Sequence, residues 1–332
     1  MAELWPTNGQ PRMSPTQPPP KNIARLKKQA NALVNWVPAP VETIRSAGVS
    51  DQNDTRLIQS RRAFQDSDVA VLLALAFVLI DDARYLNAVD RILNAWAGMN
   101  KPTGHPIDES RLDGLIWAYD LVACKLSGDR AKVFKQWLEQ LRETKERWQF
   151  GPLTRHNNHR THQLKIQILL DKVLGDDASL QRRRSEVRDH LKVNLGSRSD
   201  GASLDYEERD ALYYHVFNLE AWCEIQLQLQ CCETEIRAAF EFFAKKVQEG
   251  DTGGEFAQSI APIDAARAAA GFDYAQRNER YDVGRAARLI VQFYTFDRSA
   301  PVASMWSIAQ PKQGSKSHVF YFVRREIWNR SL

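Results

Sequence analysis

Three of the seven histidines of the chain lie within the eight residues Arg155-His-Asn-Asn-His-Arg-Thr-His162, together with two adjacent asparagines. An apolar run with helical periodicity follows them. If Asn157 to Leu170 is helical, Asn158, His159 and His162 are related by spacings of three and four residues and share one helix face. Histidine exchanges a proton near neutral pH, and asparagine donates an amide N–H to an anion. Such a density of reactive groups predicts a chemical site.

A second cluster follows at Asp200-Gly-Ala-Ser-Leu-Asp-Tyr-Glu-Glu-Arg-Asp-Ala-Leu-Tyr-Tyr-His215. It combines an arginine, two consecutive tyrosines and a histidine. Arginine offers a rigid fork of donors for a carboxylate, and a phenol can give a proton to a leaving oxygen. Together the two clusters predict one reaction centre.

This set of side chains suits β-elimination at a uronic acid. Asparagine and arginine would neutralise the carboxylate and acidify the neighbouring C5 proton, a base would remove that proton, and an acid would protonate the departing 4-oxygen. Stabilising the charge that develops on the carboxylate lowers the barrier to the enolate-like intermediate. Because this reaction needs no metal ion, we predict neither a metal nor a cofactor.

The same residues carry a resemblance to a known family. Asn157-Asn-His159 resembles the NNH-containing motif of the alginate lyase family of polysaccharide lyases. The segments 200–204 and 209–215 are similar to its DGxSL and RxALxYH segments, and the upstream residues 74–120 also resemble family members. The likeness covers about residues 66–222. It implies a polysaccharide lyase whose partner is an acidic polysaccharide, either alginate (mannuronan) or a glucuronan-like polymer.

Motif position carries residue roles over to this chain. The resemblance implies that Asn158 and Arg209 neutralise the carboxylate. It further implies that His159 is the base for one sugar epimer and that Tyr214 is the acid, or both base and acid. Additional candidates in the same motifs are His162, Tyr213, His215 and Asn157. Candidates for substrate binding are Trp148, Arg155, Arg160, His105, Arg111 and Tyr119.

The identity of the base stays open between two histidines. Alginate-specific members carry an aromatic pair after NNH, where this chain has Arg160-Thr-His162. Other members carry an NNW-x-S-H pattern, in which His162 would be the functional histidine. The acidic segment Asp205-Tyr-Glu-Glu208 also differs from that of alginate lyases. The uronate polymer, and endo against exo cleavage, therefore stay open too.

The acid poses a geometric question. Arg209 and Tyr213 are four residues apart, so on one continuous helix Tyr214 would point away from Arg209. Either Arg209 precedes the helix, or Tyr213 is the acid. We favour the first.

The elements that must position these residues are helices. Amphipathic periodicity from Asn22 onward, with turn signals at short intervals, indicates about a dozen helices in antiparallel pairs. Helical patterns cover 83–97, 110–126, 129–148, 163–174, 178–195, 211–229 and 233–248. Asp66-Ser-Asp68 is expected to cap a helix that starts at Val69. Because no repeat of fixed period is present, we predict an all-α, incomplete (α/α) toroid around a cleft, with a short C-terminal strand at Val319–Val323.

Composition narrows the function classes. We expect a Pro-rich N-terminal arm over residues 1–21 and a single catalytic domain over residues 22–332. The 45 basic and 41 acidic residues give a formal charge of +4, which is too balanced for a nucleic-acid binder. The longest apolar run, Val69–Ile80, is too short to cross a bilayer and predicts a buried helix, not a membrane anchor. No secretory signal pattern is present, and compartment and oligomeric state stay open.

Two other functions compete with the lyase. A glycoside hydrolase on the same toroid would need two carboxylates, for which Asp108, Glu109, Asp205 and Glu207 are available. A non-catalytic helical module would bind an acidic glycan without turnover. Zinc binding by His156, His159 and His162 is disfavoured because no HExxH pattern or cysteine partner completes a site.

Overall fold

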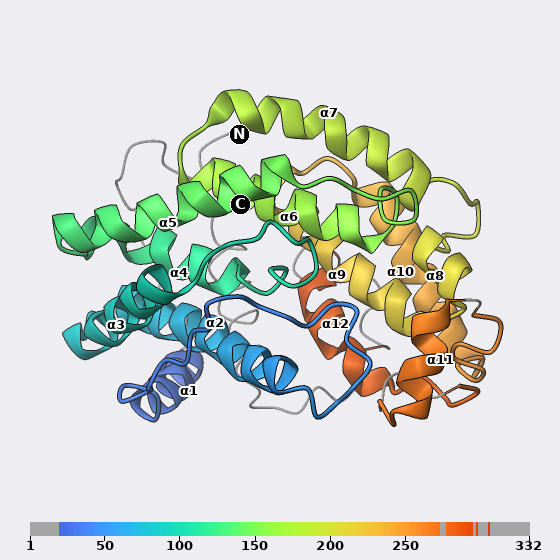
Figure 1. Cartoon of the computed structure of the whole chain (residues 1–332), viewed down its shortest axis with the longest axis horizontal. Coiled ribbons are helices and arrows are strands. Elements are labelled where there is room, and N and C mark those ends of the chain that lie inside the picture. Colours follow the sequence, from blue (N-terminus) through green and yellow to red (C-terminus); the bar gives the residue numbers. More distant parts are fainter. Residues whose placement is uncertain (1–19, 260, 273–276, 295–296, 298–304, 306–332) are drawn as a thin grey trace.

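The computed structural model of the chain describes residues 20–259, 261–272, 277–294, 297 and 305 (Figure 1). The expected strand at Val319–Val323 and residues 1–19 of the expected arm lie outside these residues. The described residues form twelve α-helices and two short 3₁₀ helices, η1 (Ala123–Lys125) and η2 (Val283–Ala286). The α-helices are α1 (Pro20–Asn31), α2 (Thr55–Ile80), α3 (Ala83–Met99), α4 (Asp113–Val122), α5 (Gly128–Arg147), α6 (Asn158–Val173), α7 (Asp177–Asn194), α8 (Leu204–Arg209), α9 (Leu212–Leu229), α10 (Glu233–Gln248), α11 (Pro262–Ala269) and α12 (Ala287–Phe293).

The helices form two layers. The inner helices α2, α4, α6, α9 and α12 contact one another in succession. The helices α3, α5, α7 and α10 pack outside them (Figure 1). Most residues of the inner helices are buried, whereas the outer helices bury one face, as amphipathic helices on a core do. No strand occurs among the described residues, and the predicted (α/α) toroid is confirmed.

Helix α2 corrects one prediction. It begins at Thr55, where Asp54 accepts hydrogen bonds from the first turn, so Asp66 and Asp68 lie within the helix and cap nothing. Asp66 is fully buried and accepts indole N–H groups from Trp36 at 2.8 Å and Trp96 at 2.9 Å. A buried carboxylate is tolerated inside an apolar helix when its oxygens are hydrogen-bonded. Asp66 therefore links α2 to its neighbours.

Helix α2 is long and apolar enough to cross a membrane by length and composition alone. However, 67% of its most apolar window is buried inside the molecule. It ends at Asp81, which adopts the left-handed conformation with φ 59°, and Asp82 caps α3. The predicted break between these two helices is confirmed, and α2 has the burial of a core helix.

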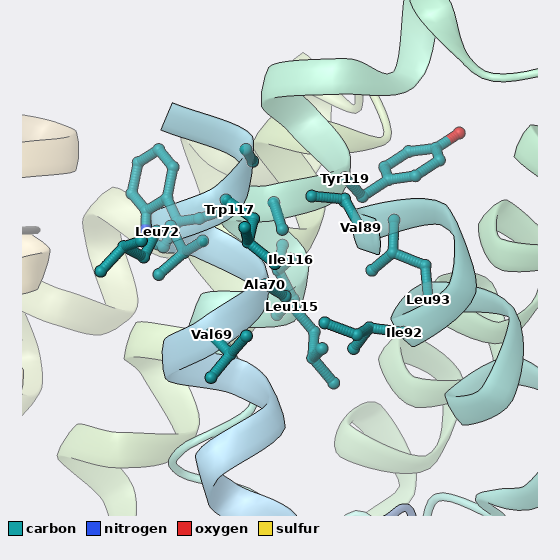
Figure 2. Packing of buried hydrophobic residues seen from close by; sticks show 14 of the residues in the cluster. Val69, Ala70, Leu72, Val89, Ile92, Leu93, Leu115, Ile116, Trp117 and Tyr119 are labelled. Atoms are coloured by element: carbon teal, nitrogen blue, oxygen red, sulfur yellow. The ribbon is translucent and has the colours of Figure 1, made fainter. Parts of the chain in front are cut away.

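Helix α6 lies between two hydrophobic cores. The first core joins α2, α3 and α4, and Figure 2 shows Val69, Ile92 and Ile116 meeting within it. Ile166 of α6 belongs to this core, whereas Leu164 of α6 belongs to the second core with α7, α9 and α10. Because apolar side chains on both sides hold α6, the orientation of its first turn is fixed by packing. That first turn carries the NNH motif.

Candidate active site

A cavity of about 760 Å³ opens between the inner helices. Its wall is formed by α2, α6, α8, α9, α11, η2 and α12 and by the loops that precede α2 and α4. The structure brings both sequence clusters to this cavity. The predicted residues that line it are His105, Arg111, Asn158, His159, His162, Arg209, Tyr213 and Tyr214.

Arg209 and Tyr214 lie on either side of a break between two helices. Arg209 is the last residue of α8, Asp210 adopts the left-handed conformation with φ 47°, and α9 starts at Leu212. The prediction that Arg209 precedes the helix is confirmed. The break lets the guanidinium lie 3.8 Å from the centre of the Tyr214 ring while Nη2 donates to the phenolic oxygen at 2.9 Å.

Two carboxylates from the segment after α10 hold this break in place. Asp264 accepts Nε of Arg209 at 2.6 Å and also pairs with Nη2. Glu255 accepts the backbone N–H of Leu212 at 2.6 Å and that of Tyr213 at 3.1 Å. Because the first N–H groups of a helix have no partner within it, Glu255 acts as a distant cap of α9. Both contacts fix the site through residues far along the chain.

Arg267 of α11 is a site residue that sequence reasoning missed. Its Nη1 donates to the phenolic oxygen of Tyr214 at 3.1 Å, and its Nε donates to the carbonyl of Val49 at 3.1 Å. The phenolic oxygen of Tyr214 therefore accepts from two guanidinium groups. Arg267 lies outside both motifs and meets Tyr214 only through the tertiary fold, so no local sequence signal could have found it.

Asn158 is held by a buried carboxylate. Asp205 accepts both the backbone N–H of Asn158, at 2.8 Å, and its side-chain amide, at 2.6 Å. Asn194 donates to the other carboxylate oxygen at 3.1 Å. Burial raises the pKa of Asp205 to about 7, against the opposing effect of these hydrogen bonds. The amide of Asn158 is thus fixed at the cavity wall by two links to one residue.

Three histidines reach the cavity in different environments. Burial, together with the nearby His105 and Arg209, lowers the pKa of His159 to about 4, so His159 is neutral at pH 7. Its ring lies 5.9 Å from that of His105. His105 follows Gly104, whose φ of 83° suits glycine and where a Cβ would overlap the carbonyl of Thr144. Burial also lowers the pKa of His162 well below its ordinary range.

Comparison with known proteins identifies the family. The alginate lyase family pattern matches residues 11–230, about two thirds of the chain. The chain belongs to the alginate lyase family. It is a polysaccharide lyase, as that family membership implies. No curated protein sequence matches it significantly.

Solved structures of alginate lyases share its fold. The chain is similar to an alginate lyase from Bacteroides ovatus, with a TM-score of 0.62 and 17% identity over 90% of this chain and 92% of that one. It is also similar to a histidine-to-alanine variant of alginate lyase A1-III complexed with a tetrasaccharide. That comparison gives a TM-score of 0.57 and 11% identity over 85% of this chain and 87% of the other. At these identities the likeness supports the fold.

The carboxylates that a glycoside hydrolase would use do not line the cavity of this alginate lyase family member. Asp108 and Glu109 accept backbone N–H groups of neighbouring loops. Asp205 is buried on Asn158, and Glu207 pairs with an exposed arginine. Among the described lining residues, Glu220 is the one carboxylate. The pair that hydrolysis needs is therefore not assembled there. Nor do three His, Cys, Asp or Glu side chains in the described part of the chain form a group that could hold a metal ion.

Two predicted site residues are structural. Tyr119 is buried against Phe134, with ring centres 5.2 Å apart, because α4 turns it into the first core. His215 is fully buried, and its ring nitrogens are 2.9 Å from the hydroxyl of Ser203 and 2.9 Å from the carbonyl of Ala239. Although both lie in or near the family motifs, neither lines the cavity. The structure therefore places Tyr119, a candidate for substrate binding, and His215, a candidate catalytic residue, away from the cavity wall.

Four further candidates lie outside the cavity wall. Asn157 caps α6 by accepting the backbone N–H of His159, and Arg160 pairs with Glu186 of α7 at 2.9 Å. Arg155 is exposed on the preceding turn. The indole of Trp148 packs edge-on against the imidazole of His105, with ring centres 4.8 Å apart. Trp148 therefore contacts a residue of the cavity wall without lining the cavity itself. For Asn157 and Arg160, the first turn of α6 explains why they face away from the cavity while Asn158 and His159 line it, since successive residues of a helix point in different directions.

Proposed function

We propose that this lyase cleaves a uronic-acid polymer of the alginate (mannuronan) or glucuronan type by β-elimination. The charge of the cavity wall carries this proposal. Among the described residues, one carboxylate, that of Glu220, lines it together with seven basic side chains: Arg61, Arg111, Lys165, Arg209, Arg267, Arg285 and Arg288. A wall with this excess of positive charge attracts a polyanion such as a polyuronate.

Arg209 and Asn158 are proposed to bind the carboxylate of the sugar that loses its C5 proton. Nε of Arg209 donates to Asp264, and Nη2 donates to both Asp264 and Tyr214. The described residues give Nη1 no partner. That nitrogen is available to a substrate oxygen. Because Asp264 holds the guanidinium in place beforehand, little reorganisation accompanies the growth of negative charge on the carboxylate.

His159 is proposed to remove the C5 proton. Its burial keeps it neutral at pH 7, and a neutral imidazole has a nitrogen lone pair to accept a proton. The electron pair of the broken C–H bond forms the C4–C5 double bond, and the bond from C4 to its oxygen breaks. His162 stays a candidate for the same role, and kinetics separate the two below.

Tyr214 is proposed to protonate the departing 4-oxygen. Its phenolic oxygen accepts from Arg209 and Arg267, which uses both lone pairs, and the described residues offer its O–H no acceptor. The proton can therefore be given to substrate. The same two guanidinium groups stabilise the phenolate that is left. Solvent then returns the proton from His159 to Tyr214.

The test is incubation with mannuronan, guluronan, glucuronan, hyaluronan and pectate while the ultraviolet absorbance of the unsaturated uronate is followed. A rise on mannuronan or glucuronan supports the proposal and names the substrate. A rise on pectate or hyaluronan alone corrects the polymer and keeps the reaction. Reducing ends without that absorbance indicate hydrolysis and contradict the proposal.

A further inference from the structure

His162 is a buried polar side chain whose ring nitrogens have no hydrogen-bond partner among the described residues. It is 3% exposed, and it lines the cavity. Its ring packs against Phe217 with centres 4.2 Å apart, which fixes the plane of the imidazole. A buried polar atom left without a hydrogen bond is costly, so a polar ligand is the expected partner of these nitrogens.

Two cations lie beside His162 on the same wall. Lys165 is three residues farther along α6, and Arg288 reaches the wall from α12. Both are anchored by Asp113, at 2.9 Å from Lys165 and 3.1 Å from Arg288. Lys165 also donates to the carbonyl of Ser110 at 2.6 Å. This group is built in advance, because Asp113 and Ser110, and Glu220 at 3.8 Å from Arg288, hold its cations in place.

Along α6, Lys165 lies beyond the reacting groups, and His162 lies one turn from Asn158 and His159, between them and Lys165. Asn158 and Lys165 are seven residues apart on one face, which corresponds to about 10 Å along the helix axis. That is longer than one pyranose ring. The described wall therefore extends past the sugar that Asn158 and Arg209 would bind, toward the sugar next to it.

We propose that His162, Lys165 and Arg288 form a second sugar subsite, which binds the carboxylate and a hydroxyl of the uronate next to the one that is deprotonated. The proposal rests on the proposed function. Lys165 and Arg288 attract the carboxylate. A neutral imidazole carries one N–H donor and one acceptor nitrogen, so it can donate to a carboxylate oxygen and accept from a hydroxyl. This pair of groups is what each residue of a polyuronate presents.

Burial keeps His162 in this neutral form. Its pKa is lowered well below the ordinary range by burial and then by the charges of Lys165 and Arg288, against the effect of Asp113. His159 faces it from the preceding turn. A neutral His162 adds no charge of its own, so it selects for hydrogen-bonding groups, whereas the lysine and arginine select for charge.

The test measures binding without turnover. In a Tyr214→Phe background, affinities for mannuronate and glucuronate tetrasaccharides are measured by calorimetry for the parent and for His162→Phe, which keeps the aromatic contact with Phe217. We expect His162→Phe to weaken the better tetrasaccharide about tenfold, the loss of roughly one hydrogen bond. The matched control is His156→Phe, at an exposed histidine outside the cavity wall, which should bind as the parent does.

Two further variants test the subsite if His162→Phe does not fold. His162→Gln keeps a donor and an acceptor, so its affinity for the tetrasaccharide should lie within about threefold of that of the parent. Lys165→Gln should bind the tetrasaccharide about tenfold more weakly. It should also show less preference for the native sugar over its carboxyl-reduced form. Thermal unfolding checks each variant. Unchanged affinity in His162→Phe, or in Lys165→Gln, overturns the subsite while leaving the proposed function intact.

Kinetics with intact Tyr214 separate a subsite from a base. We expect His162→Phe to raise KM and to leave kcat within about threefold, as loss of uniform binding does. A fall of kcat by about 10² would make His162 the base and overturn the subsite. If no tetrasaccharide binds and no polymer is cleaved by the wild type, the proposed function fails, and the subsite fails with it.

Discussion

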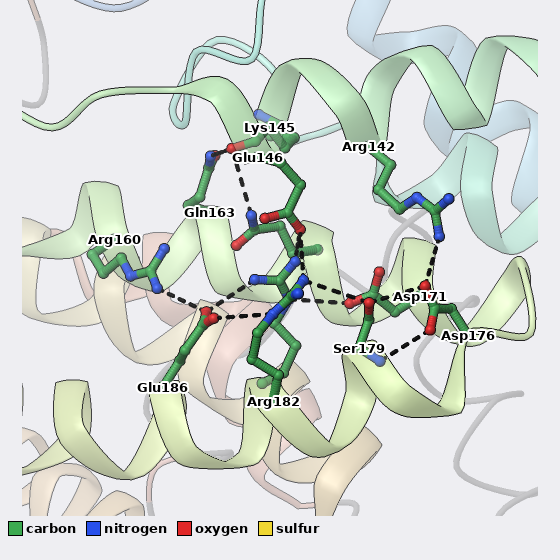
Figure 3. Close-up of polar contacts among 12 residues, drawn as sticks. Arg142, Lys145, Glu146, Arg160, Gln163, Asp171, Asp176, Ser179, Arg182 and Glu186 are labelled. Carbon is green, nitrogen blue, oxygen red and sulfur yellow. Dashed lines mark hydrogen bonds and ion pairs between the residues drawn. The ribbon is translucent and has the colours of Figure 1, made fainter.

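Helix α6 presents two groups of charged side chains on opposite faces. Away from the cavity, an outer arginine cluster joins α5, α6 and α7 (Figure 3). It consists of Arg142, Arg160, Arg182 and Arg183 with Glu146, Asp171, Asp176 and Glu186. Here four cations meet four carboxylates, and each guanidinium is paired. The cluster has little capacity left for a ligand.

The cavity face is balanced differently. Among the described residues, seven basic side chains line the wall with one carboxylate, and Asp113, Asp264 and Asp282 pair with wall cations without lining the cavity themselves. The number of arginines alone therefore does not indicate the proposed binding site, because the outer cluster is also rich in them. At the cavity, basic side chains outnumber carboxylates among the described lining residues, and a wall of net positive charge attracts an incoming anion. Four changes test this difference.

Tyr214→Phe should have the largest effect. We expect kcat to fall by about 10³ or more, roughly 4 kcal/mol, because the proton donor to the leaving oxygen is lost. Tyr213→Phe changes the neighbouring residue and keeps its backbone N–H, which donates to Glu255, so its effect should be about tenfold or less. Unsaturated product is measured for both. Full activity in Tyr214→Phe contradicts the acid assignment.

Arg183→Met should break the outer cluster without touching catalysis. Its guanidinium is buried and lies 3.0 Å from the fully buried Asp171, so the variant leaves a buried carboxylate unpaired and should cost about 3 kcal/mol of unfolding free energy. Arg182→Met, at a half-exposed side chain of the same helix, should cost less than about 1 kcal/mol. Urea unfolding measures both. Equal costs would refute the pairing argument, and kcat should match the wild type in each folded variant.

Asn158→Ala should lower kcat/KM by about 10², or roughly 2.7 kcal/mol, because one donor to the developing charge is removed. Asn157→Ala is the matched control, since Asn157 caps α6 and does not line the cavity. It should cost about 1 kcal/mol of stability and little activity. The two asparagines would exchange roles if the control lost turnover and Asn158→Ala did not.

The smallest expected effect is the loss of activity on the acid side of the pH profile. Because the pKa of His159 is lowered to about 4, the neutral base persists as pH falls and is lost only on passing that value. We expect kcat/KM on the best polymer to fall about tenfold per pH unit below pH 4. A limb near pH 6.5 that disappears in His159→Gln would show that the base is not desolvated.

Local patterns in the sequence predict the helices well. Asp81 and Asp82 end one helix and start the next, as their capping chemistry predicts, and α10 runs over the predicted residues. Asp66 misleads because its side chain type suits a cap, while its oxygens are in fact satisfied by indoles that come from elsewhere in the fold. Local chemistry cannot distinguish these two outcomes.

The site could be predicted where its residues share an element or a motif. Lys165 lies one turn after His162 and could have been found from helical spacing alone. Arg267 and Arg288 could not, because they reach the cavity only through packing of α11 and α12. His215 shows the reverse error, since a residue within the motif serves the core.

The dependence of Arg209 and Tyr214 on α11 has a consequence for biosynthesis. The motifs emerge from the ribosome well before Asp264 and Arg267, which orient them. A nascent chain that has folded through α10 holds the motif residues and lacks the partners that aim them. With the roles proposed for Arg209 and Tyr214, competence for catalysis arrives with the docking of α11, and substitutions in α11 are expected to alter turnover while both motifs stay untouched.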